Sequence, residues 1–441
     1  MIKTKITPLI CLLCLAINVF AKDQAAVAMP DSYSAEIAAD ILNKGGNAVD
    51  AAIAAQFVLA VTLPEAGNIG GGGFMLIYKD KKAEFLDYRE EAPLKAHRDM
   101  YLNESGDVIQ GKSLFGVLAS GVPGTVDGMW QAHQKHGSLP WKTLVQPAVE
   151  LAKNGLIVHE KLAKKIKRMS NYYNKNNIAV NFDDYFLSAK SGEVFKQPEL
   201  ANTLVRIRDQ GKIGFYQGKT ADIIVEFMKK HNGIISHKDL VGYQAKWREP
   251  LQKNWQEYQV ITSPPPSSGG IAILQWLNMY QLLADKNIEH NSIPYIHLLS
   301  EIGKRVFADR AEYLGDPDFV KVPVSQLISD DYIKMRAKGV DLINISNTEQ
   351  IKPGLKESED TTHFSIIDQW GNAVSNTTTI NIGFGSGMVV SGAGFLLNDE
   401  MDDFSIKAGV PNVFGAVGGK ANEIQPQKRM LSSMTPTIVL K

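Results

Sequence analysis

The chain has 441 residues, with 47 Lys or Arg against 47 Asp or Glu, so its formal net charge at pH 7 is zero. This balance argues against a nucleic-acid-binding protein, and a hydrophobic content of 44% is typical of a globular protein. Both cysteines, Cys11 and Cys14, lie near the N-terminus, which excludes disulfides, thiolate metal sites and a cysteine nucleophile from the rest of the chain.

Residues 1–21 have the features of a secretory signal peptide. Lys3 and Lys5 form a basic start, and an apolar run from 6 to 19 follows. This run is too short for a stable membrane anchor, and Ala21 is a small residue at a plausible cleavage point before Lys22. We therefore predict an exported, periplasmic or secreted protein with no membrane anchor.

The region from 22 to 360 is predicted to be rich in helices. Asp31 can cap a helix over 34–44, and an almost wholly apolar stretch over 48–61 predicts a buried helix. A glycine-rich loop over 67–73 leads into a hairpin with strands at 74–78 and 84–88. Most of 143–249 is predicted to be helical. The remaining predicted elements are helices over 144–154, 220–232, 271–285 and 295–313 and a strand over 260–262.

The character of the sequence changes after residue 340. Residues 343–360 are polar, and Pro353-Gly354 interrupts any helix, so we predict an exposed linker over 340–360. Strands are then predicted over 361–368, 373–380, 394–397 and 437–440. Helices followed by strands indicate an α+β fold in which two sheets lie between helical layers.

Thr361 is a candidate nucleophile because of its position. It is the first residue of a predicted strand and directly follows the polar linker. If the peptide bond before it is broken, Thr361 gains a free α-amine next to its own hydroxyl, and that amine can act as the general base. A threonine at the start of a strand is also an ordinary structural residue, so the position alone does not decide its role.

Long runs of residues distributed over nearly the whole chain resemble one family. In the C-terminal part they are 360–368, 371–374, 397–404, 409–412, 417–419 and 431–437. In the preceding part they are 46–52, 64–74, 87–93, 121–124 and 264–270. In sequence and order they resemble the γ-glutamyltransferase (γ-glutamyltranspeptidase) family. The resemblance implies an Ntn-hydrolase αββα four-layer sandwich and a precursor that cleaves itself before Thr361. The products would be a large subunit, 22–360, and a small subunit, 361–441, that stay together as a heterodimer.

The resemblance also implies the roles of individual residues. Read alone, most of these side chains would be structural; for example, an exposed arginine commonly forms a surface salt bridge. An arginine suits a carboxylate because its guanidinium forms two parallel hydrogen bonds. The resemblance makes Thr361 the nucleophile and Thr379 a second threonine that contacts it. The donor α-carboxylate would be bound by Arg89, Ser432 and Ser433. The donor α-ammonium group would be bound by Asn381, Glu400 and Asp403.

The implied activity is γ-glutamyl transfer from glutathione-type donors, through a γ-glutamyl-threonine ester, to water, amino acids or dipeptides. We predict neither a cofactor nor a metal, since the histidines form no ligand set. One alternative is a cephalosporin-type acylase of the same fold, although Arg89 and the serine pair favour an amino-acid donor. Another is an inactive remnant. Family members continue to a Pro-Gly-Gly-Ser segment whose amides form the oxyanion hole, so a small-subunit region ending at Lys441 is expected to be truncated and unprocessed.

Overall fold

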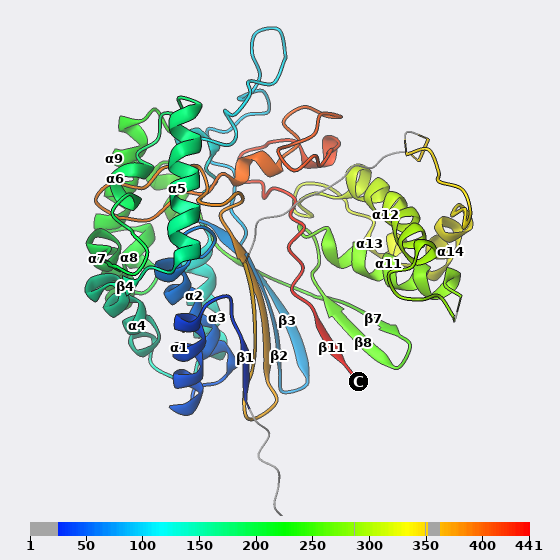
Figure 1. The fold of residues 1–441 in the computed structure, drawn as a ribbon, viewed down its shortest axis with the longest axis horizontal. Coiled ribbons are helices and arrows are strands. Elements are labelled where there is room, and N and C mark those ends of the chain that lie inside the picture. Colours follow the sequence, from blue (N-terminus) through cyan, green and yellow to red (C-terminus); the bar gives the residue numbers. More distant parts are fainter. Residues whose placement is uncertain (1–24, 286, 349, 352–361) are drawn as a thin grey trace, which may run out of the picture.

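The computed structural model describes residues 25–285, 287–348, 350–351 and 362–441 (Figure 1). The helices are α1 (Ser32–Asn43), α2 (Ala48–Thr62), α3 (Thr125–His136), α4 (Trp141–Asn154), α5 (Glu160–Lys175), α6 (Phe182–Phe186), α7 (Pro198–Gln210), α8 (Ile213–Tyr216), α9 (Gly218–Lys230), α10 (His237–Gly242), α11 (Gly269–Leu283), α12 (Ile293–Tyr313), α13 (Val324–Leu327) and α14 (Asp330–Lys338). The strands are β1 (Ala26–Ala28), β2 (Gly72–Lys79), β3 (Lys82–Asp87), β4 (Leu156–Ile157), β5 (Val194–Phe195), β6 (Lys246–Arg248), β7 (Leu251–Trp255), β8 (Tyr258–Thr262), β9 (Thr362–Ile367), β10 (Ala373–Thr379) and β11 (Ile438–Leu440).

The largest sheet has the strand order β1-β9-β10-β2-β3-β6, and every neighbouring pair is antiparallel. Helices from the first half of the chain cover one of its faces. The central helix of this layer is α2, in which every residue is buried and whose N-terminus is capped by Asn47. Asp31 caps α1 through its side chain, as the sequence predicted.

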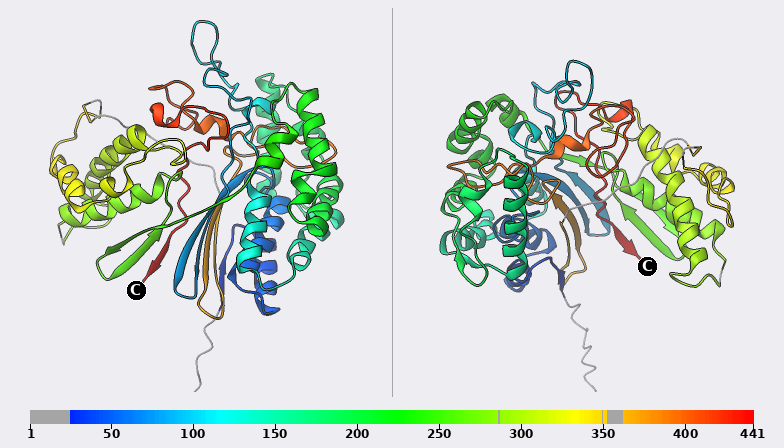
Figure 2. Two further views of the ribbon diagram at one scale, coloured as in Figure 1. Left: turned by 180° about the vertical axis from the view of Figure 1, so that it is seen from behind. Right: turned by 45° about the horizontal axis from the view of Figure 1, so that its top comes forward.

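A second sheet, with the order β11-β8-β7, packs on the other face of the first. Phe74, Leu76 and Phe85 from the first sheet meet Ile261 from the second sheet and Met434 in a shared apolar core. Helices α11 to α14 lie outside the second sheet (Figures 1 and 2). The layers therefore run helix, sheet, sheet, helix, which confirms the predicted α+β fold and αββα sandwich.

The hairpin formed by β9 and β10 is inserted between two strands from the start of the chain. β9 pairs with β1, and β10 pairs with β2. In this register Thr362 lies opposite Thr378, and Thr379 lies opposite Gly72. The C-terminal end of β10 is therefore next to the glycine-rich loop.

Most of the predicted elements are present, with boundaries that differ by at most three residues. The predicted strand over 394–397 is wrong, because Leu396 forms only an isolated bridge with Val389. Gly392 and Gly394 have positive φ angles and form a tight turn at the start of this segment, so its pairing is limited to that bridge. The described start of the linker is exposed, and Ile343 is 87% accessible. The signal peptide, the linker from 352 to 360 and Thr361 lie outside the described residues.

Candidate active site

Arg89 lies just beyond the end of β3, at the edge where the sheet meets the loops of the C-terminal part. Its backbone N–H donates to Asp87 Oδ1 (3.0 Å), and its carbonyl accepts from the Tyr243 hydroxyl (2.8 Å). The arginine side chain is fully buried. A buried guanidinium is stable only when its charge and its N–H groups are satisfied, so its partners define this part of the molecule.

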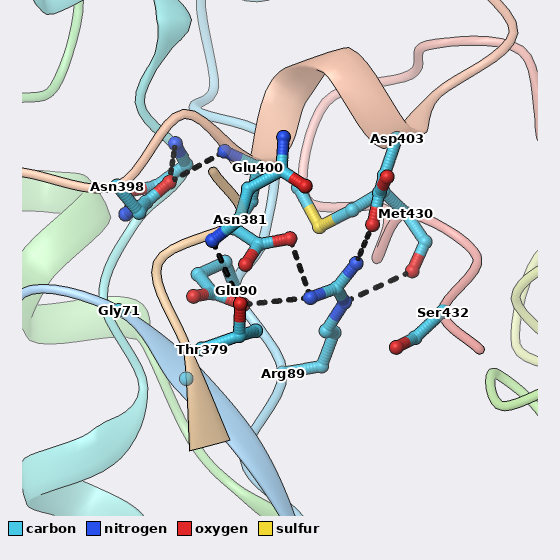
Figure 3. Close-up of polar contacts among 12 residues, drawn as sticks. Gly71, Arg89, Glu90, Thr379, Asn381, Asn398, Glu400, Asp403, Met430 and Ser432 are labelled. Carbon is cyan, nitrogen blue, oxygen red and sulfur yellow. Dashed lines mark hydrogen bonds and ion pairs between the residues drawn. The ribbon is translucent and has the colours of Figure 1, made fainter. Parts of the chain in front are cut away.

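Three carboxyl groups surround the Arg89 guanidinium (Figure 3). Nη1 lies 2.5 Å from Glu400 Oε2 and 3.5 Å from Glu90 Oε2, and Nη2 pairs with Asp403 Oδ2. Nε donates to the carbonyl oxygen of Met430 (3.3 Å). The Asp403 side chain retains 18% exposure and that of Glu400 only 1%. The cluster therefore opens to solvent on the side of Asp403.

One cation facing three carboxyl groups perturbs their ionisation. Burial raises the pKa of Glu90 to about 7, although Arg89 opposes this shift. Burial also raises the pKa of Glu400 well above its usual value, again against the effect of Arg89. Apart from their ion pairs with Arg89, the Glu90 and Glu400 carboxyl groups receive no hydrogen bond of good geometry among the described residues. Because buried acceptors without a donor are costly, the cluster favours a ligand that supplies N–H groups.

Glu400 and Asp403 occupy a short 3-10 helix, Glu400–Asp403, that Asn398 holds in place. The Asn398 amide oxygen accepts from Gly121 N (2.9 Å) and Glu400 N (3.1 Å), while its amide nitrogen donates to Gly70 O (2.8 Å). This residue ties the acidic helix to the glycine-rich loop. The family resemblance assigned no role to Asn398 or Glu90, although both lie in the runs that carry it.

A second buried arginine fixes the segment on the other side of Arg89. Arg429 Nη1 lies 2.6 Å from Asp87 Oδ2, and its Nη2 lies 3.0 Å from Glu91 Oε1. Nη2 also donates to the Gln244 carbonyl oxygen (2.7 Å). These contacts fix the position of Arg429. The next residue, Met430, accepts a hydrogen bond from Arg89 through its carbonyl oxygen.

Thr379 and Asn381 lie where β10 ends. Thr379 Oγ1 accepts a hydrogen bond from Asn381 N (2.8 Å), and Asn381 has a left-handed backbone with φ of 76°. The Asn381 amide donates to the carbonyl (3.1 Å) and side chain (3.2 Å) of Asp399 rather than to Glu400 or Asp403. The structure thus brings Asn381 to the acidic segment through Asp399.

The glycine-rich loop lets the backbone approach this strand end closely. A Cβ atom on Gly71 would lie 2.2 Å from the carbonyl oxygen of Thr379, and one on Gly70 would lie 2.1 Å from that of Leu396. Any side chain there would displace the backbone. The glycines therefore serve close packing of the loop against the end of β10.

The two serines diverge. Ser432 is buried beside Arg89 and Met430 (Figure 3), and its hydroxyl accepts from Met434 N (3.2 Å). The Ser433 hydroxyl instead lies 3.3 Å from Arg310 Nη2 and 3.4 Å from Ser268 Oγ. The structure therefore places Ser432 near the predicted carboxylate site and turns Ser433 toward Arg310.

Thr361 itself is outside the described residues, but its neighbour Thr362 is the first residue of β9. Thr362 is buried and lies opposite Thr378, one residue before Thr379. The described start of β9, the residue that follows Thr361 in the sequence, therefore lies beside the end of β10.

The described residues contain no group of three or more His, Cys, Asp or Glu side chains arranged to hold a metal ion. Over the same part of the chain, no helix has both the length and the hydrophobicity to cross a membrane.

A family model described as gamma-glutamyltranspeptidase matches residues 34–441. The chain belongs to the γ-glutamyltranspeptidase family. A glutathione hydrolase proenzyme from Pseudomonas aeruginosa is 56% identical over 421 residues, which are 95% of this chain and 75% of the relative. Arg89 and the C-terminal motifs lie within the span of the family model.

Two solved structures place the fold among Ntn-hydrolases. A γ-glutamyltranspeptidase from Pseudomonas nitroreducens, complexed with L-DON, is 55% identical with a TM-score of 0.72 and covers 75% of this chain and 98% of its own. A cephalosporin acylase from Bacillus halodurans is 27% identical with a TM-score of 0.81 and covers 95% of this chain and 75% of its own. The backbone is thus common to transpeptidases and acylases, whereas sequence identity is higher with the transpeptidase.

Proposed function

We propose that the protein is an exported γ-glutamyltransferase and glutathione hydrolase precursor. It cleaves itself before Thr361 and then transfers γ-glutamyl groups to water, amino acids or dipeptides. The observation that carries the proposal is the buried Arg89 with Glu400 and Asp403 beside the end of β10. A cation and acids at this position match the carboxylate and ammonium groups of a γ-glutamyl donor.

Processing uses the Thr361 hydroxyl. Its oxygen attacks the Asp360 carbonyl carbon, the peptide C–N bond breaks, and the nitrogen takes the hydroxyl proton. The resulting ester is opened by water, which leaves a carboxylate on Asp360 and frees the hydroxyl and α-amine of Thr361. The anchored start of β9 supports this step, because holding one peptide bond in a fixed geometry contributes much of such a rate.

In turnover, the Thr361 α-amine accepts the hydroxyl proton as the oxygen attacks the donor γ-carbonyl carbon. Breaking the C–N bond then releases the leaving amine, cysteinylglycine in the case of glutathione, which takes up that proton. Water or an acceptor amine attacks the ester and regenerates Thr361. Thr379, at the neighbouring strand end, is proposed to contact the nucleophile.

The donor's free amino-acid end is proposed to enter the Arg89 cluster. Its carboxylate pairs with Arg89 and is contacted by Ser432, whereas Ser433, which the resemblance also assigns to this carboxylate, faces Arg310 in the structure. Its ammonium group is bound by Asn381, Glu400 and Asp403. Glu400 Oε2 is paired with Arg89, and its Oε1 has no hydrogen-bond donor among the described residues, so an ammonium N–H group would satisfy it. This explains why so many acids lie around one arginine.

The test compares the full-length protein with Thr361→Ala and Thr361→Ser on a denaturing gel. The wild type should give two pieces that separate before Thr361, the serine variant should cleave more slowly, and the alanine variant should stay a single band. γ-Glutamyl p-nitroanilide should be hydrolysed much faster than glutaryl p-nitroanilide, which lacks the α-amino group. Preference for the glutaryl compound would favour an acylase. An uncleaved wild type without turnover would overturn the proposal.

A further inference from the structure

Asn68, in the glycine-rich loop, is a buried amide that bonds to the end of β10. Its Nδ2 donates to the carbonyl oxygen of Thr379 (2.8 Å) and to Thr378 Oγ1 (3.0 Å). Its Oδ1 accepts from Gly71 N (2.9 Å) and from the Thr125 hydroxyl (2.7 Å). Because a backbone N–H can only donate, the contact with Gly71 determines which end of the amide faces β10. The side chain is thus oriented as well as buried.

The two bonds to β10 reach consecutive residues through different groups. Asn68 binds the side chain of Thr378 and the main chain of Thr379. Successive side chains of a strand point to opposite faces, so the Thr379 side chain lies on the other face, toward Arg89 (Figure 3). Bonds before and after the Thr379 Cα fix the direction of its Cβ, and therefore the position from which its hydroxyl can act.

The loop that carries Asn68 is itself held from two sides. Gln56 Nε2, from the buried helix α2, lies 3.2 Å from the Asn68 carbonyl oxygen and 3.3 Å from Thr378 Oγ1. On the other side, a Cβ atom on Gly71 would lie 2.9 Å from Asn68 Oδ1 and 2.2 Å from the Thr379 carbonyl oxygen. Only a glycine leaves room there for the bond between the Asn68 amide and Thr379.

These bonds also join the two sides of the proposed cleavage point. Asn68 precedes Thr361, whereas Thr378 and Thr379 follow it. Thr378 lies opposite Thr362, the first residue of β9. An amide from the first cleavage product would therefore set the strand end of the second product, next to the start of β9.

We propose that Asn68 is a positioning residue for the proposed reaction, on which this inference rests. By holding the end of β10, it directs the Thr379 hydroxyl toward the nucleophile. Asn68 acts through Thr379 and contacts neither the donor nor the reacting atoms. Its loss should therefore reduce the rate of turnover, while donor binding, which the Arg89 cluster provides, should change little.

The test measures kcat and KM for γ-glutamyl p-nitroanilide in Asn68→Ala, Thr379→Ala and the double variant. Asn68→Ala should lower kcat about tenfold, as expected for loss of a buried hydrogen bond, and should change KM by less than about twofold. In the Thr379→Ala background, the same change should alter kcat by less than about twofold, because the hydroxyl that Asn68 directs is already absent.

Asn181→Ala is the matched control. The Asn181 amide also bridges main-chain groups, since it donates to Val389 O (2.8 Å) and accepts from Val389 N (2.9 Å). Its loss should lower the thermal midpoint and leave kcat unchanged in both backgrounds.

If Asn68→Ala does not fold, Thr125→Val and Thr125→Ser provide the same test. The valine variant lacks the hydroxyl that donates to Asn68 Oδ1, so it should lower kcat without changing KM. The serine variant keeps this hydroxyl and should retain the kcat of the wild type. Equal kcat values for the valine and serine variants would contradict the inference.

The same factor of loss for Asn68→Ala in the wild type and in Thr379→Ala would overturn the inference, because it would show a general structural role. The NMR signal of the Thr379 methyl group needs no turnover, and it should shift in Asn68→Ala but not in Asn181→Ala. If the wild type does not hydrolyse the anilide while this shift is present, the proposed function fails and the positioning contact stands. If the wild type hydrolyses the anilide and the two losses multiply, the inference fails alone.

Discussion

The guanidinium of Arg89 donates a hydrogen bond to the carboxylate of Asp403, 314 residues later in the chain. One partner precedes the proposed cleavage point at Thr361, and the other follows it. Glu400, which also pairs with Arg89, lies on the later side as well. The cluster therefore exists only when both parts of the chain are folded together.

Replacing Arg89 by lysine should strongly impair use of γ-glutamyl donors. Arg89 contacts Glu400, Asp403 and Met430 in three directions, and a single ammonium cannot reproduce this geometry. Loss of a desolvated charge pair should reduce transition-state binding by on the order of 2–5 kcal/mol, measured as kcat/KM for γ-glutamyl p-nitroanilide. Arg98→Lys, at an exposed surface pair, is the control. Unchanged kinetics in Arg89→Lys would exclude Arg89 from donor binding.

Glu90 should make stability depend on pH in an unusual direction. Burial raises its pKa from 4.5 to about 7, so between these values the folded protein keeps a proton that the unfolded chain has lost. Stability should therefore fall as pH rises through this window, by up to roughly 3 kcal/mol. Thermal unfolding midpoints of the wild type and Glu90→Gln, compared at pH 5 and pH 8, test this.

The Glu90→Gln variant should lose the fall in stability between pH 5 and pH 8 that Glu90 causes. Glu104→Gln, at an exposed position, should keep it. The same slope in wild type and Glu90→Gln would show that Glu90 does not hold the proton.

The sequence predicted the elements with strong local signals. Asp31 caps α1, and the apolar stretch of α2 is buried throughout. The three-residue strands β1 and β6 were missed because their pairing is set by β9 and β3, and three residues show no periodicity of their own. The strand predicted over 394–397 failed because glycines with positive φ angles made a turn.

For the site, the family resemblance identified Arg89, Glu400 and Asp403, which the structure brings into contact. It did not reveal that Glu90 is buried against the same guanidinium, because charge in a sequence does not report burial. The adjacent positions of Ser432 and Ser433 suggested one shared role, yet neighbouring residues in extended backbone face opposite sides. The roles of all these residues in catalysis stay predictions.

Arg429→Met should destabilise the folded protein. The change removes the charge that faces Asp87 and Glu91, leaving buried acids with fewer partners. Breaking a buried pair from one side costs roughly 3–5 kcal/mol, which should appear as a lower thermal midpoint. Arg208→Met, at a partly exposed pair with Asp209, should lower the midpoint much less. Equal midpoints for both variants would contradict a role for Arg429 in holding its segment.

The proposed export can be checked chemically. The basic start and apolar run predict removal of residues 1–21, so N-terminal sequencing of secreted or periplasmic protein should begin near Lys22. Replacing two apolar residues of the run, Leu12 and Leu13, by arginine should keep the protein inside the cell. Secreted protein that still begins at Met1 would contradict the prediction.

The insertion of the β9–β10 hairpin between β1 and β2 determines what cleavage before Thr361 can and cannot do. Each cleavage product would contribute inner strands to the same sheet. Neither product can therefore dissociate without breaking the backbone hydrogen bonds on both sides of the hairpin. Made separately, the first product would carry a gap two strands wide, and the second would be a bare ribbon open along both edges, prone to associate wrongly. Synthesis as one chain therefore allows the two future polypeptides to place their strands side by side in one sheet before cleavage makes them separate molecules.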